Sequence, residues 1–481
     1  MTAILNYRCD FISEDKFIPH GITIEKIIDL EKGLIYEHDV LIWNNNFLFG
    51  PQQLKLFPKL KFFINWGVDD KNIQTHKQFI KRGVTVKKVD YYCTETLSEY
   101  VLAIILSFER KLKLLLSDQK VKGNEIYGKS VGIIGLGKIG FRLAQIFKKS
   151  FNCQVYYYSR QNKLLDSFDY IDIKKIFQIC DYVILTVKSR DLSINGKSLL
   201  SANKNLVIVN ISNDSVLPLK TILPLIKSGK IRGYMGDLLN TNIEKRSLPE
   251  NVILVNKYGY LTNEAKTIKD NILLTYLKKA SYEGIPNNLY IIRHGQTEWN
   301  KSGVFQGSLD SSLTKEGIQN AQKIAHLLKN KQISVIFTSP LGRAKQTAKI
   351  ISSKIKAKVI IIPDFREMNF GIFEGKKQKA VKNLFREFFA KRAKNKFYKL
   401  YEPYPEGENY FNVFLRIVKS LTGILPSYQN FVIIGHESVN RIIRGIIREL
   451  PLEEMIFLRQ KNSELISINF HTLKETIVNI D

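Results

Sequence analysis

The stretch SVGIIGLGKIG, residues 130–140, contains the pattern that determines the fold of the first half of this chain. An apolar run is followed by three glycines at the spacing G-x-G-x-x-G, and a helix with one apolar face follows them. Glycines suit a tight turn, a close backbone approach to a pyrophosphate and a helix N-terminus that faces its charge. In this strand–turn–helix context the pattern predicts a dinucleotide site. The candidate cofactor-binding residues here are Gly135, Gly137, Lys138, Ile139 and Gly140.

The segment QVYYYSR, residues 154–160, is expected to form the next strand of this nucleotide-binding unit. About 20 residues after the glycines, NAD-binding proteins carry an acidic side chain that holds the ribose 2′-hydroxyl. Ser159 and Arg160 stand at this place instead, and an arginine can pair with the 2′-phosphate of NADP. We therefore expect NADP(H) as the cofactor ahead of NAD(H). The alternative is an Arg160 that points to solvent.

Short apolar strands alternate with polar helical stretches along the whole chain, which predicts an α/β fold with mostly parallel sheets. A length of 481 residues suggests about three domains. Thr96 and Glu99 form a capping-box pattern at the start of a long helix. Gly284 and Pro286 interrupt both periodicities, which predicts a linker. The predicted organisation is a first domain at 1–105, a Rossmann domain with a C-terminal return helix at 106–280, a linker at 281–288 and a second α/β protein at 289–481.

The net charge of +28 is the unusual feature of the composition. Lysines are spread over nearly every polar stretch, whereas nucleic-acid binding favours basic residues that are bunched or interleaved with aromatic ones. We expect no nucleic-acid partner, and an electrostatic field that attracts small anionic substrates. The densest runs, KKQKAVK (376–382) and KRAKNK (391–396), are expected to be solvated helix faces.

The sequence shows no membrane or secretion signal. No apolar run approaches the ~18–20 residues of a membrane span. The start, MTAILNYRCDFISED, has no basic segment followed by an apolar one. Its four cysteines lie in the first half without paired metal-ligand spacing. We expect a cytoplasmic protein with free thiols and no membrane partner.

Taken together, the first 280 residues resemble the D-isomer-specific 2-hydroxyacid dehydrogenases. The resemblance is carried by LKFFINWGVDDKNI, TETLSEYVLAIILSFER, GIIGLGKIG and NVILVNKYGYLTNEA. It implies a flavodoxin-like substrate domain at 1–105 and a doubly wound, NAD(P)-binding Rossmann domain at 106–280. It also implies that Asp237 lies near the nicotinamide amide, and dehydrogenases of this type commonly form homodimers through the cofactor domain.

This first half departs from the pattern of that family at its catalytic positions. The family binds the substrate carboxylate with an Arg and moves a proton with a Glu–His pair, but the corresponding positions hold Asn213, about Asn242, and Lys257. Asparagine lacks the charge-assisted hydrogen bonds of a cation, which contribute about 1.5–3 kcal/mol. Losing the general acid/base costs about 10²–10⁴ in rate. We expect cofactor binding without the family's catalysis, unless Lys257 serves as a proton donor.

In the second half, residues suited to covalent phosphate-ester hydrolysis follow several predicted strands. This chemistry uses a neutral imidazole to attack phosphorus, fixed cations around its oxygens, and a carboxylic acid for the leaving oxygen. His294 follows the strand LYII in RHGQTEWN (293–300), and His436 follows the strand FVIIG. Arg343 begins a helix in SPLGRAKQT, and Glu367 lies in FREMNFGIFEG. Because strand ends gather ligands in α/β sheets, we expect these side chains to converge.

The order of these motifs resembles the histidine phosphatase superfamily, also called phosphoglycerate mutase-like, from about residue 288 to at least 441. The resemblance implies an α/β sandwich at 289–481 in which His294 becomes phosphohistidine without any metal. It implies that Arg293, Arg343 and a protonated His436 hold the phosphoryl oxygens. Glu367, ahead of the nearby Glu374 and Glu408, would donate a proton and then activate water. The implied pocket residues that contact phosphate or substrate are Asn300, Gln306 and Gly307.

Three functions remain open from the sequence. The preferred one is a phosphatase of a small phosphorylated metabolite, with a first half that binds cofactor and lacks catalysis. The second is a bifunctional oxidoreductase and phosphatase that acts on one phosphorylated hydroxy or oxo acid. The third is a phosphoglycerate-type mutase. The stretch VFQGSLDSSLTKEG (304–317) is similar to the phosphatase and sugar-bisphosphatase branches and lacks the Gly-Trp pair of the glycolytic mutases.

Overall fold

The computed structural model describes most of the chain as two compact units. One unit is Asp90–Thr267, and the other joins Met1–Val89 to Ile268–Asp481. The domain limits expected at 105, 280 and 288 stay predictions, and helix α3 (Thr94–Glu109) continues through residue 105. The described residues are 2–6, 14–17, 22–27, 34–43, 49–66, 73–90, 92–187, 192–237, 248–255, 258–281, 288–427 and 430–480.

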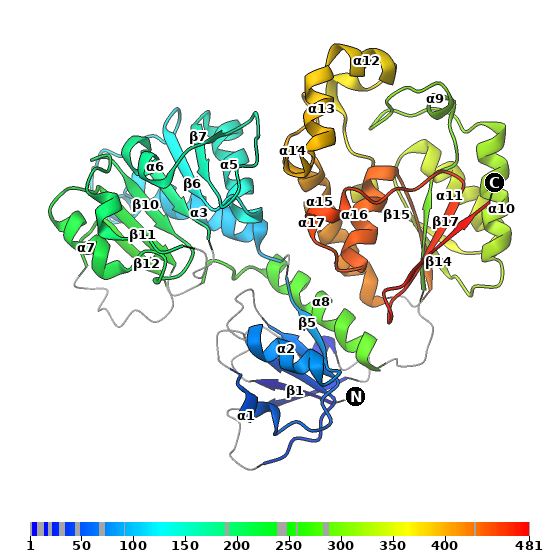
Figure 1. The fold of residues 1–481 in the computed structure, drawn as a ribbon, viewed down its shortest axis with the longest axis horizontal. Coiled ribbons are helices and arrows are strands. Elements are labelled where there is room, and N and C mark those ends of the chain that lie inside the picture. Colours follow the sequence, from blue (N-terminus) through cyan, green and yellow to red (C-terminus); the bar gives the residue numbers. More distant parts are fainter. Residues whose placement is uncertain are drawn as a thin grey trace. The chain divides into compact units, whose positions relative to one another are not determined.

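The described part of the first 89 residues forms a parallel five-stranded sheet in the order β2-β1-β3-β4-β5 (Figure 1). Aromatic side chains fill its core, where the rings of Phe63 and Phe79 stack at a centroid distance of 4.5 Å. Its elements are β1 (Thr2–Asn6), β2 (Thr23–Ile27), β3 (Val40–Trp43), α1 (Pro51–Leu54), β4 (Phe62–Asn65), α2 (Ile73–Lys81) and β5 (Thr85–Lys88).

The unit Asp90–Thr267 contains a parallel seven-stranded sheet in the order β12-β11-β10-β9-β6-β7-β8. The chain leaves β6 toward β7 on one side and later returns to β9 on the other. This reversal is the topological switch point at which open α/β sheets bind ligands. The strands are β6 (Ser130–Ile134), β7 (Gln154–Tyr158), β8 (Asp169–Tyr170), β9 (Tyr182–Leu185), β10 (Val207–Asn210), β11 (Gly233–Asp237) and β12 (Val252–Val255).

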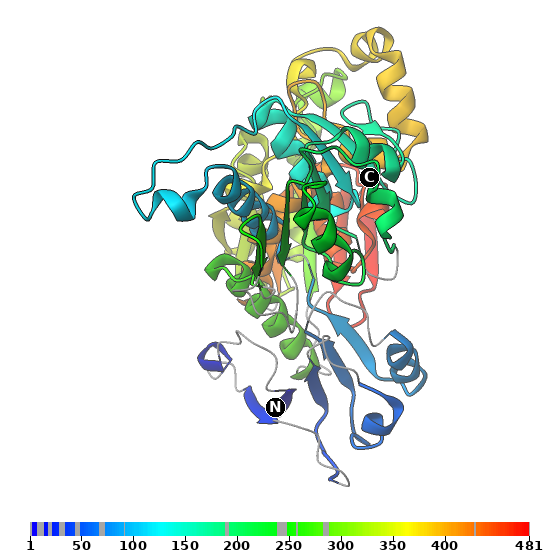
Figure 2. The ribbon, with the colours of Figure 1, turned by 90° about the vertical axis from the view of Figure 1, so that its left-hand side faces the viewer.

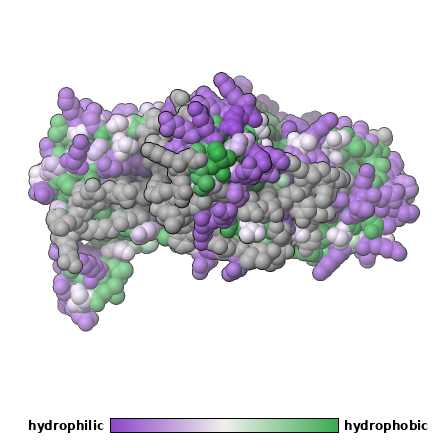
Figure 3. Space-filling model, turned by 90° about the horizontal axis from the view of Figure 1, so that it is seen from below, coloured by the Kyte–Doolittle hydropathy of each residue, from purple (hydrophilic) through white to green (hydrophobic). Residues whose placement is uncertain are grey.

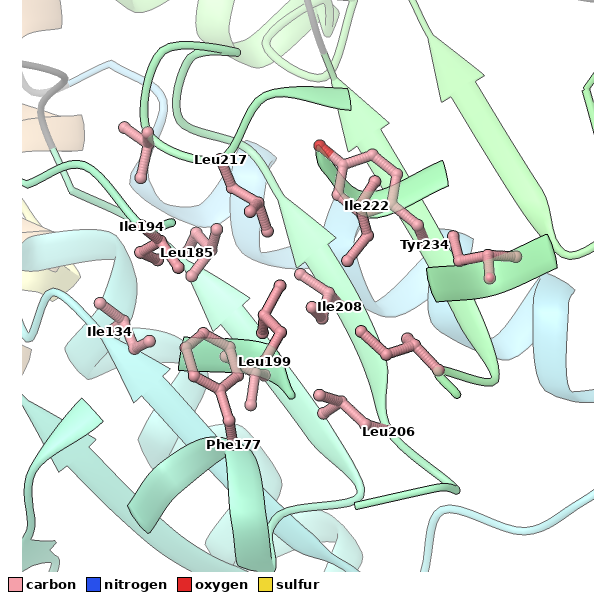
Figure 4. Packing of buried hydrophobic residues seen from close by; sticks show 14 of the residues in the cluster. Ile134, Phe177, Leu185, Ile194, Leu199, Leu206, Ile208, Leu217, Ile222 and Tyr234 are labelled. Carbon is pink, nitrogen blue, oxygen red and sulfur yellow. The ribbon is translucent and has the colours of Figure 1, made fainter. Parts of the chain in front are cut away.

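The core of this unit lies between the sheet and the helices on one of its faces. Ile134, Leu185 and Ile208 project from three adjacent strands toward Phe177 of α6 and Ile222 of α7, as Figure 4 shows. All five side chains have no exposed surface, and burying such a side chain contributes about 1.5–3 kcal/mol. The helices of the unit are α3, α4 (Leu112–Leu115), α5 (Lys138–Phe151), α6 (Ile173–Ile179) and α7 (Leu219–Lys227), and α8 (Asn263–Ser281) follows them.

The start of α3 differs from the expected capping box. The helix begins at Thr94 after Cys93, whose side chain makes no capping hydrogen bond. Thr96 therefore lies inside the first turn, and its hydroxyl lies 3.4 Å from the hydroxyl of Thr262. Its side chain is buried, so tertiary packing determines its position in place of the local cap.

Residues 288–480 form a mixed six-stranded sheet in the order β15-β14-β16-β13-β17-β18. The four strands β15, β14, β16 and β13 are parallel, and β17 and β18 are antiparallel additions at one edge. Because β16 lies between β13 and β14, this sheet also has a switch point in its centre. The strands are β13 (Asn288–Arg293), β14 (Val335–Thr338), β15 (Lys358–Ile361), β16 (Phe431–Gly435), β17 (Glu464–Asn469) and β18 (Glu475–Asn479).

Helices enclose this sheet, and a smaller group of helices forms a separate feature after β15. Figure 2 shows the helix pair α12 and α13, coloured gold, projecting from the rest of this domain. Phenylalanines pack beneath this pair, around the fully buried Phe373. The helices are α9 (Glu298–Lys301), α10 (Lys315–Leu328), α11 (Gly342–Ile355), α12 (Gln378–Leu384), α13 (Arg386–Lys394), α14 (Lys396–Tyr401), α15 (Tyr410–Ile424), α16 (Glu437–Ile447) and α17 (Leu452–Met455).

The face shown in Figure 3 is mostly hydrophilic where its residues are described. On the face in Figure 3, hydrophilic side chains surround small separate hydrophobic areas. Among the described helices, none has the length and apolar character that a bilayer crossing requires. Cys153 and Cys180 are buried free thiols, and Cys93 is buried as well.

Candidate active site

Three adjacent strand ends bring the predicted phosphate-binding residues together. Arg293 of β13 pairs in register with Gly435 of β16, so His294 and His436 leave neighbouring strands at the same level. The His294 N–H donates to the Gly435 carbonyl at 3.0 Å, and the two imidazole centroids are 5.1 Å apart. Strand β14 is the other neighbour of β16, and the helix that follows it supplies Arg343. Parallel pairing of central strands therefore builds this site.

Both ring nitrogens of His294 have hydrogen-bond partners that suit a neutral imidazole. Its Nδ1 lies 2.8 Å from the Gly295 carbonyl, and its Nε2 accepts from Nε of Arg343 at 3.2 Å. This arrangement places the proton on Nδ1 and the lone pair on Nε2. Burial, together with the Arg343 and Arg293 guanidinium groups, lowers the pKa of His294 well below its usual value. A neutral imidazole is the nucleophilic form.

Arg343 is buried and its orientation is determined by acceptors from one loop. Its Nη1 donates to the Leu309 carbonyl at 2.6 Å and to Oδ1 of Asp310 at 3.0 Å. Its Nη2 donates to the carbonyl of Gly307 at 2.8 Å. These bonds hold the guanidinium against His294, where it can meet a phosphoryl oxygen that bonds to that imidazole.

His436 differs from the expected protonated form. Its Nε2 lies 2.7 Å from Oγ of Ser339, whereas its Nδ1 is buried without a partner among the described residues. Burial and then the charge of Arg343 lower the pKa of His436 well below its usual value, so the protein alone keeps it neutral. Burial and the adjacent cations disfavour a further positive charge here, and a protonated His436 that holds phosphoryl oxygens stays a prediction. A phosphate dianion nearby would favour protonation.

Arg293 lines the same cavity as His294. Its Nη1 forms an ion pair with Oε2 of Glu437 at 3.0 Å and donates to the carbonyl of Gln460 at 3.1 Å. Its Nε is buried without a partner in the described part of the chain. An unpaired buried donor of a charged group is costly, so an oxygen acceptor from a ligand would stabilise it.

Glu367 lines this cavity together with Glu437, and Glu437 is held in ion pairs with Arg293 and Arg441. One oxygen of Glu367 accepts from the Met368 N–H at 2.8 Å and the other from the Ser438 N–H at 3.4 Å. Burial raises its pKa above the ordinary value, as a proton donor needs. The alternatives have other partners: Glu374 accepts from Ser308 and Phe370, and Glu408 pairs with Arg366 and Arg416. The described lining of the cavity includes Glu367 and neither alternative.

Seven of the eight residues expected around the phosphate line a cavity of about 390 Å³, and His436 is the eighth, outside the described lining. Gln306 donates from Nε2 to Oγ1 of Thr297 at 2.8 Å, while its buried Oε1 has no described partner. Asn300 caps α9 by accepting from the Thr297 N–H at 3.1 Å. Gly307 has φ +57°, and a Cβ there would lie 1.8 Å from Oε1 of Glu374. Only glycine therefore allows its carbonyl to accept from Arg343.

Most lysines of the two basic runs are exposed, as expected, but Arg392 is not. Arg392, in the run 391–396, is only 5% exposed and lines the cavity, and Lys382 of the other run lines it too. The missed signal is aromatic: Phe385, Phe388 and Phe389 lie between the two runs and Phe397 and Tyr398 follow the second, whereas a solvated segment is polar throughout. Sequence reasoning also missed the ion-pair partners Asp310 and Glu437, which follow or flank the recognised motifs.

The glycine turn after β6 shows which of its glycines a ligand would require. Gly135 has φ +105°, and a Cβ on Gly140 would lie 2.2 Å from the Gly135 carbonyl, so protein geometry requires both glycines. Gly137 caps α5 with φ −83°, and no described atom lies within 4 Å of a Cβ built there. Backbone strain and packing do not require glycine at 137. An open approach of pyrophosphate to the N-terminus of α5, beside Lys138 and Ile139, does explain it.

The expected ribose-binding residues lie beside this turn. The Gly135 N–H donates to the Tyr158 carbonyl at 2.8 Å, so Ser159 and the exposed Arg160 follow directly at the end of β7. Asp237 ends β11 and is 2% exposed. Its carboxylate accepts from the N–H groups of Tyr258 at 3.0 Å and Gly259 at 3.3 Å.

Of the three residues expected to replace the dehydrogenase family's catalytic Arg, Glu and His, the structure describes one, Asn213. Asn213 follows β10, and its carbonyl accepts from Nδ2 of Asn210 at 3.3 Å. Asn242 and Lys257 lie outside the described residues. Within the described ranges, no group of three His, Cys, Asp or Glu side chains is arranged to hold a metal ion.

The fold and the two sites define an α/β chain with a phosphate-type anion site and a separate dinucleotide-type turn. Residues 289–481 match the histidine phosphatase superfamily (branch 1). A Hydrogenobacter thermophilus protein named "Putative phosphoserine phosphatase 2" is 32% identical over 194 residues, which are 40% of this chain and 93% of that protein. The chain therefore belongs to the histidine phosphatase superfamily, and its C-terminal domain is a phosphohydrolase domain of that superfamily.

The preceding part matches dehydrogenases. Residues 105–258 match the NAD binding domain of the D-isomer specific 2-hydroxyacid dehydrogenases. The Pyrococcus furiosus glyoxylate reductase is 26% identical over 286 residues, covering 54% of this chain and 82% of that protein. The solved NADPH-dependent glyoxylate/hydroxypyruvate reductase from Sinorhizobium meliloti shares the fold, with a TM-score of 0.51, 19% identity, and coverage of 59% of this chain and 95% of that chain. Both predicted resemblances and the α/β fold are thus confirmed.

Proposed function

We propose that this chain is a metal-independent phosphomonoester hydrolase that acts through a phosphohistidine on His294. The single observation that carries the proposal is the state of that imidazole. Its Nδ1 is hydrogen-bonded to a carbonyl, its Nε2 lone pair accepts a hydrogen bond from Arg343, and the residue lines the cavity. The residues Arg293, Arg343, Asn300, Gln306 and Gly307 are proposed to bind the phosphate, and His436 is proposed to gain a proton when the phosphate dianion enters.

The proposed reaction has two steps. Nε2 of His294 attacks phosphorus, the ester P–O bond breaks, and Glu367 gives its proton to the departing oxygen. Glu367, now a carboxylate, then takes a proton from water as the water oxygen attacks the phosphohistidine. The P–N bond breaks, and inorganic phosphate leaves with His294 restored. The guanidinium groups stabilise the negative charge on the equatorial oxygens in both steps.

Hydrolysis rather than mutase chemistry is proposed. The sequence 304–317 places Gln306 and Gly307 at the cavity, and the relative that this chain covers to 93% is named a phosphatase. A small phosphorylated metabolite is the proposed substrate, since the cavity volume of about 390 Å³ lies near the lower end of small-ligand pockets.

Metal-free turnover of p-nitrophenyl phosphate tests this proposal. The purified chain is expected to release nitrophenolate at the same rate with and without a chelator, because protein cations replace a metal in this site. Added magnesium or zinc should not raise kcat. A complete lack of turnover, or turnover that a chelator abolishes, contradicts the proposal.

For the half that precedes residue 281 we propose NADP(H) binding without the catalysis of the dehydrogenase family. A homodimer through residues 106–280 stays a prediction. The glycine turn fits a dinucleotide, since Gly137 leaves open the approach that a pyrophosphate needs. Gly135, Gly137, Lys138, Ile139 and Gly140 would hold the pyrophosphate, Ser159 and Arg160 the 2′-phosphate, and Asp237 the nicotinamide end. A bound nicotinamide would supply hydride chemistry. We propose that this chain lacks the residues that use it, since Asn213, about Asn242, and Lys257 stand at the positions matched to the family's Arg, Glu and His.

Cofactor preference is expected to depend on Arg160. The wild-type chain should bind NADPH more tightly than NADH by about 10-fold or more, because a charge-assisted bond to the 2′-phosphate contributes about 1.5–3 kcal/mol. Arg160→Ala should remove this preference, as measured by NAD(P)H fluorescence titration. Gly137→Ala is the matched control, since it should weaken both cofactors equally. Tighter NADH than NADPH binding by the wild type would overturn the assignment of Arg160.

A further inference from the structure

The two imidazoles of the candidate active site are held by partners of different chemistry. Nδ1 of His294 lies 2.8 Å from the carbonyl of Gly295, which can only accept a hydrogen bond. Nε2 of His436 lies 2.7 Å from Oγ of Ser339, and a hydroxyl can both donate and accept. The carbonyl therefore requires a hydrogen on its nitrogen, whereas the hydroxyl suits a nitrogen with or without one.

Ser339 directly follows β14, and backbone groups of two other elements fix its position. Its N–H donates to the carbonyl of Ile434 in β16 at 3.1 Å. Its Oγ accepts at 3.2 Å from the N–H of Leu341, the residue that caps α11. Ser339 and His436 both have an exposed fraction of 0%. The contact between them thus joins two fixed groups that are shielded from solvent.

The hydrogen bonds around Ser339 define the tautomer of a neutral His436. A hydroxyl has one hydrogen and two acceptor lone pairs. One lone pair of Ser339 accepts from Leu341, and Nε2 of His436 is the described acceptor for its hydrogen. A neutral ring that accepts at Nε2 carries its own hydrogen on Nδ1. This Nδ1 is buried without a partner among the described residues. Because buried donors are nearly always satisfied, an acceptor from a ligand fits here.

The same hydroxyl suits a protonated His436. An imidazolium donates from both of its nitrogens, and the second lone pair of Ser339 can then accept from Nε2. Nδ1 remains the nitrogen that a phosphoryl oxygen can meet, because Ser339 occupies Nε2 in both states. A carbonyl in place of this hydroxyl would require a hydrogen on Nε2, and a backbone N–H would exclude one. A hydroxyl is therefore suited to a ring that changes its charge.

We propose that Ser339 is a positioning residue of the phosphatase reaction, whose hydroxyl holds His436 with Nδ1 toward the phosphoryl group in both protonation states. This inference rests on the proposed function, in which His436 gains a proton when phosphate enters. The competing explanation is a purely structural serine that connects β14 to α11 through its bond to Leu341. That structural role requires no particular tautomer of His436.

Removal of the hydroxyl tests its contribution to turnover. Ser339→Ala leaves Nε2 of a buried imidazole without its described partner, so we expect kcat/KM for p-nitrophenyl phosphate to fall by about 10- to 100-fold. Ser339→Thr keeps a hydroxyl and should recover most of this loss. Ser353→Ala is the matched control, because Ser353 is an exposed serine of α11 outside the described cavity lining. It should retain the wild-type kcat/KM.

Nitrogen NMR of protein that contains isotope-labelled histidine provides a readout that a purely structural serine would not change. In the free wild type, His436 should be a single tautomer with its hydrogen on Nδ1. Saturating inorganic phosphate should convert this ring to the imidazolium. In Ser339→Ala the single tautomer should give way to a mixture, because the hydroxyl no longer selects one nitrogen. His436→Gln assigns the signal by removing it.

Turnover and tautomer together decide the role of Ser339. A wild-type kcat/KM in Ser339→Ala, or a lowered kcat/KM with the single tautomer retained, would overturn the positioning role while wild-type turnover still supports the phosphatase. A tautomer that depends on Ser339 in a wild type without any turnover would support the hydrogen bond and refute the phosphatase. Circular dichroism identifies a variant that does not fold. Ser339→Cys, whose thiol is a weak hydrogen-bond partner, then replaces Ser339→Ala.

Discussion

Replacing His294 by alanine is expected to lower kcat for phosphate esters by about 10⁴ or more and to remove the covalent phosphoenzyme. Loss of a nucleophile that acts together with its partners has a cost of this order or larger in other covalent enzymes. The physical reason is that His294 alone supplies the proposed nucleophile, Nε2, which lies 3.2 Å from Nε of Arg343. Its described neighbours can bind phosphate or transfer protons but do not replace the nucleophile. Steady-state kinetics and trapping with a labelled phosphate ester measure the two effects.

The trapping experiment requires a neutral or alkaline quench, because phosphohistidine is labile to acid. His326→Ala is the matched control, since His326 is an exposed histidine of α10 that lies outside the described cavity lining. It should retain wild-type turnover and labelling. Label that persists in His294→Ala, or label located on another residue of the wild type, would refute the covalent step.

Glu367→Gln is expected to lower kcat for alkyl phosphates by about 10²–10⁴, the usual contribution of a general acid. The effect on p-nitrophenyl phosphate should be smaller in the bond-breaking step, because nitrophenolate can leave without a proton. Glu406→Gln is the control, since Glu406 is an exposed carboxylate of the neighbouring loop. A variant that hydrolyses alkyl phosphates at the wild-type rate would refute the role of Glu367.

The pH dependence should identify the same group. Burial raises the pKa of Glu367, so its acid form persists above the ordinary carboxyl range. Because the acid form donates the proton, kcat/KM for alkyl phosphates should fall as pH rises through this raised pKa. Glu367→Gln should lack that alkaline decline, and pH–rate profiles of the two proteins show the difference. An unchanged decline in the variant would assign it to another group.

Local sequence patterns predicted much of the fold and the residues of the candidate site. Alternation of apolar strands with helices gave the confirmed α/β class, and the glycine spacing after β6 marked the switch point of the seven-stranded sheet. His294 and Arg343 could be selected because short motifs place them directly after strands. A parallel sheet then brings such positions to one edge, whatever the length of chain between them.

Other properties depended on contacts between distant residues. The capping pattern at Thr96 did not mark the start of α3, which begins at Thr94, and the Thr96 hydroxyl lies 3.4 Å from the hydroxyl of the distant Thr262. The choice among the three carboxylates required their partners, since Glu374 and Glu408 are engaged by their own loops. The lowered pKa of His436 follows from its burial, which the sequence does not show.

By itself, the sequence determined that two α/β proteins are joined on this chain, and which groups of the second one can attack, hold and protonate a phosphate ester. These properties depend on residue type and on position at strand ends, which short motifs encode. Only the tertiary structure showed the burial that lowers the pKa of both histidines and placed Arg392, from an expected solvated run, in the cavity wall. Burial and unpaired donors arise from packing between distant segments, and no local pattern of residues records them.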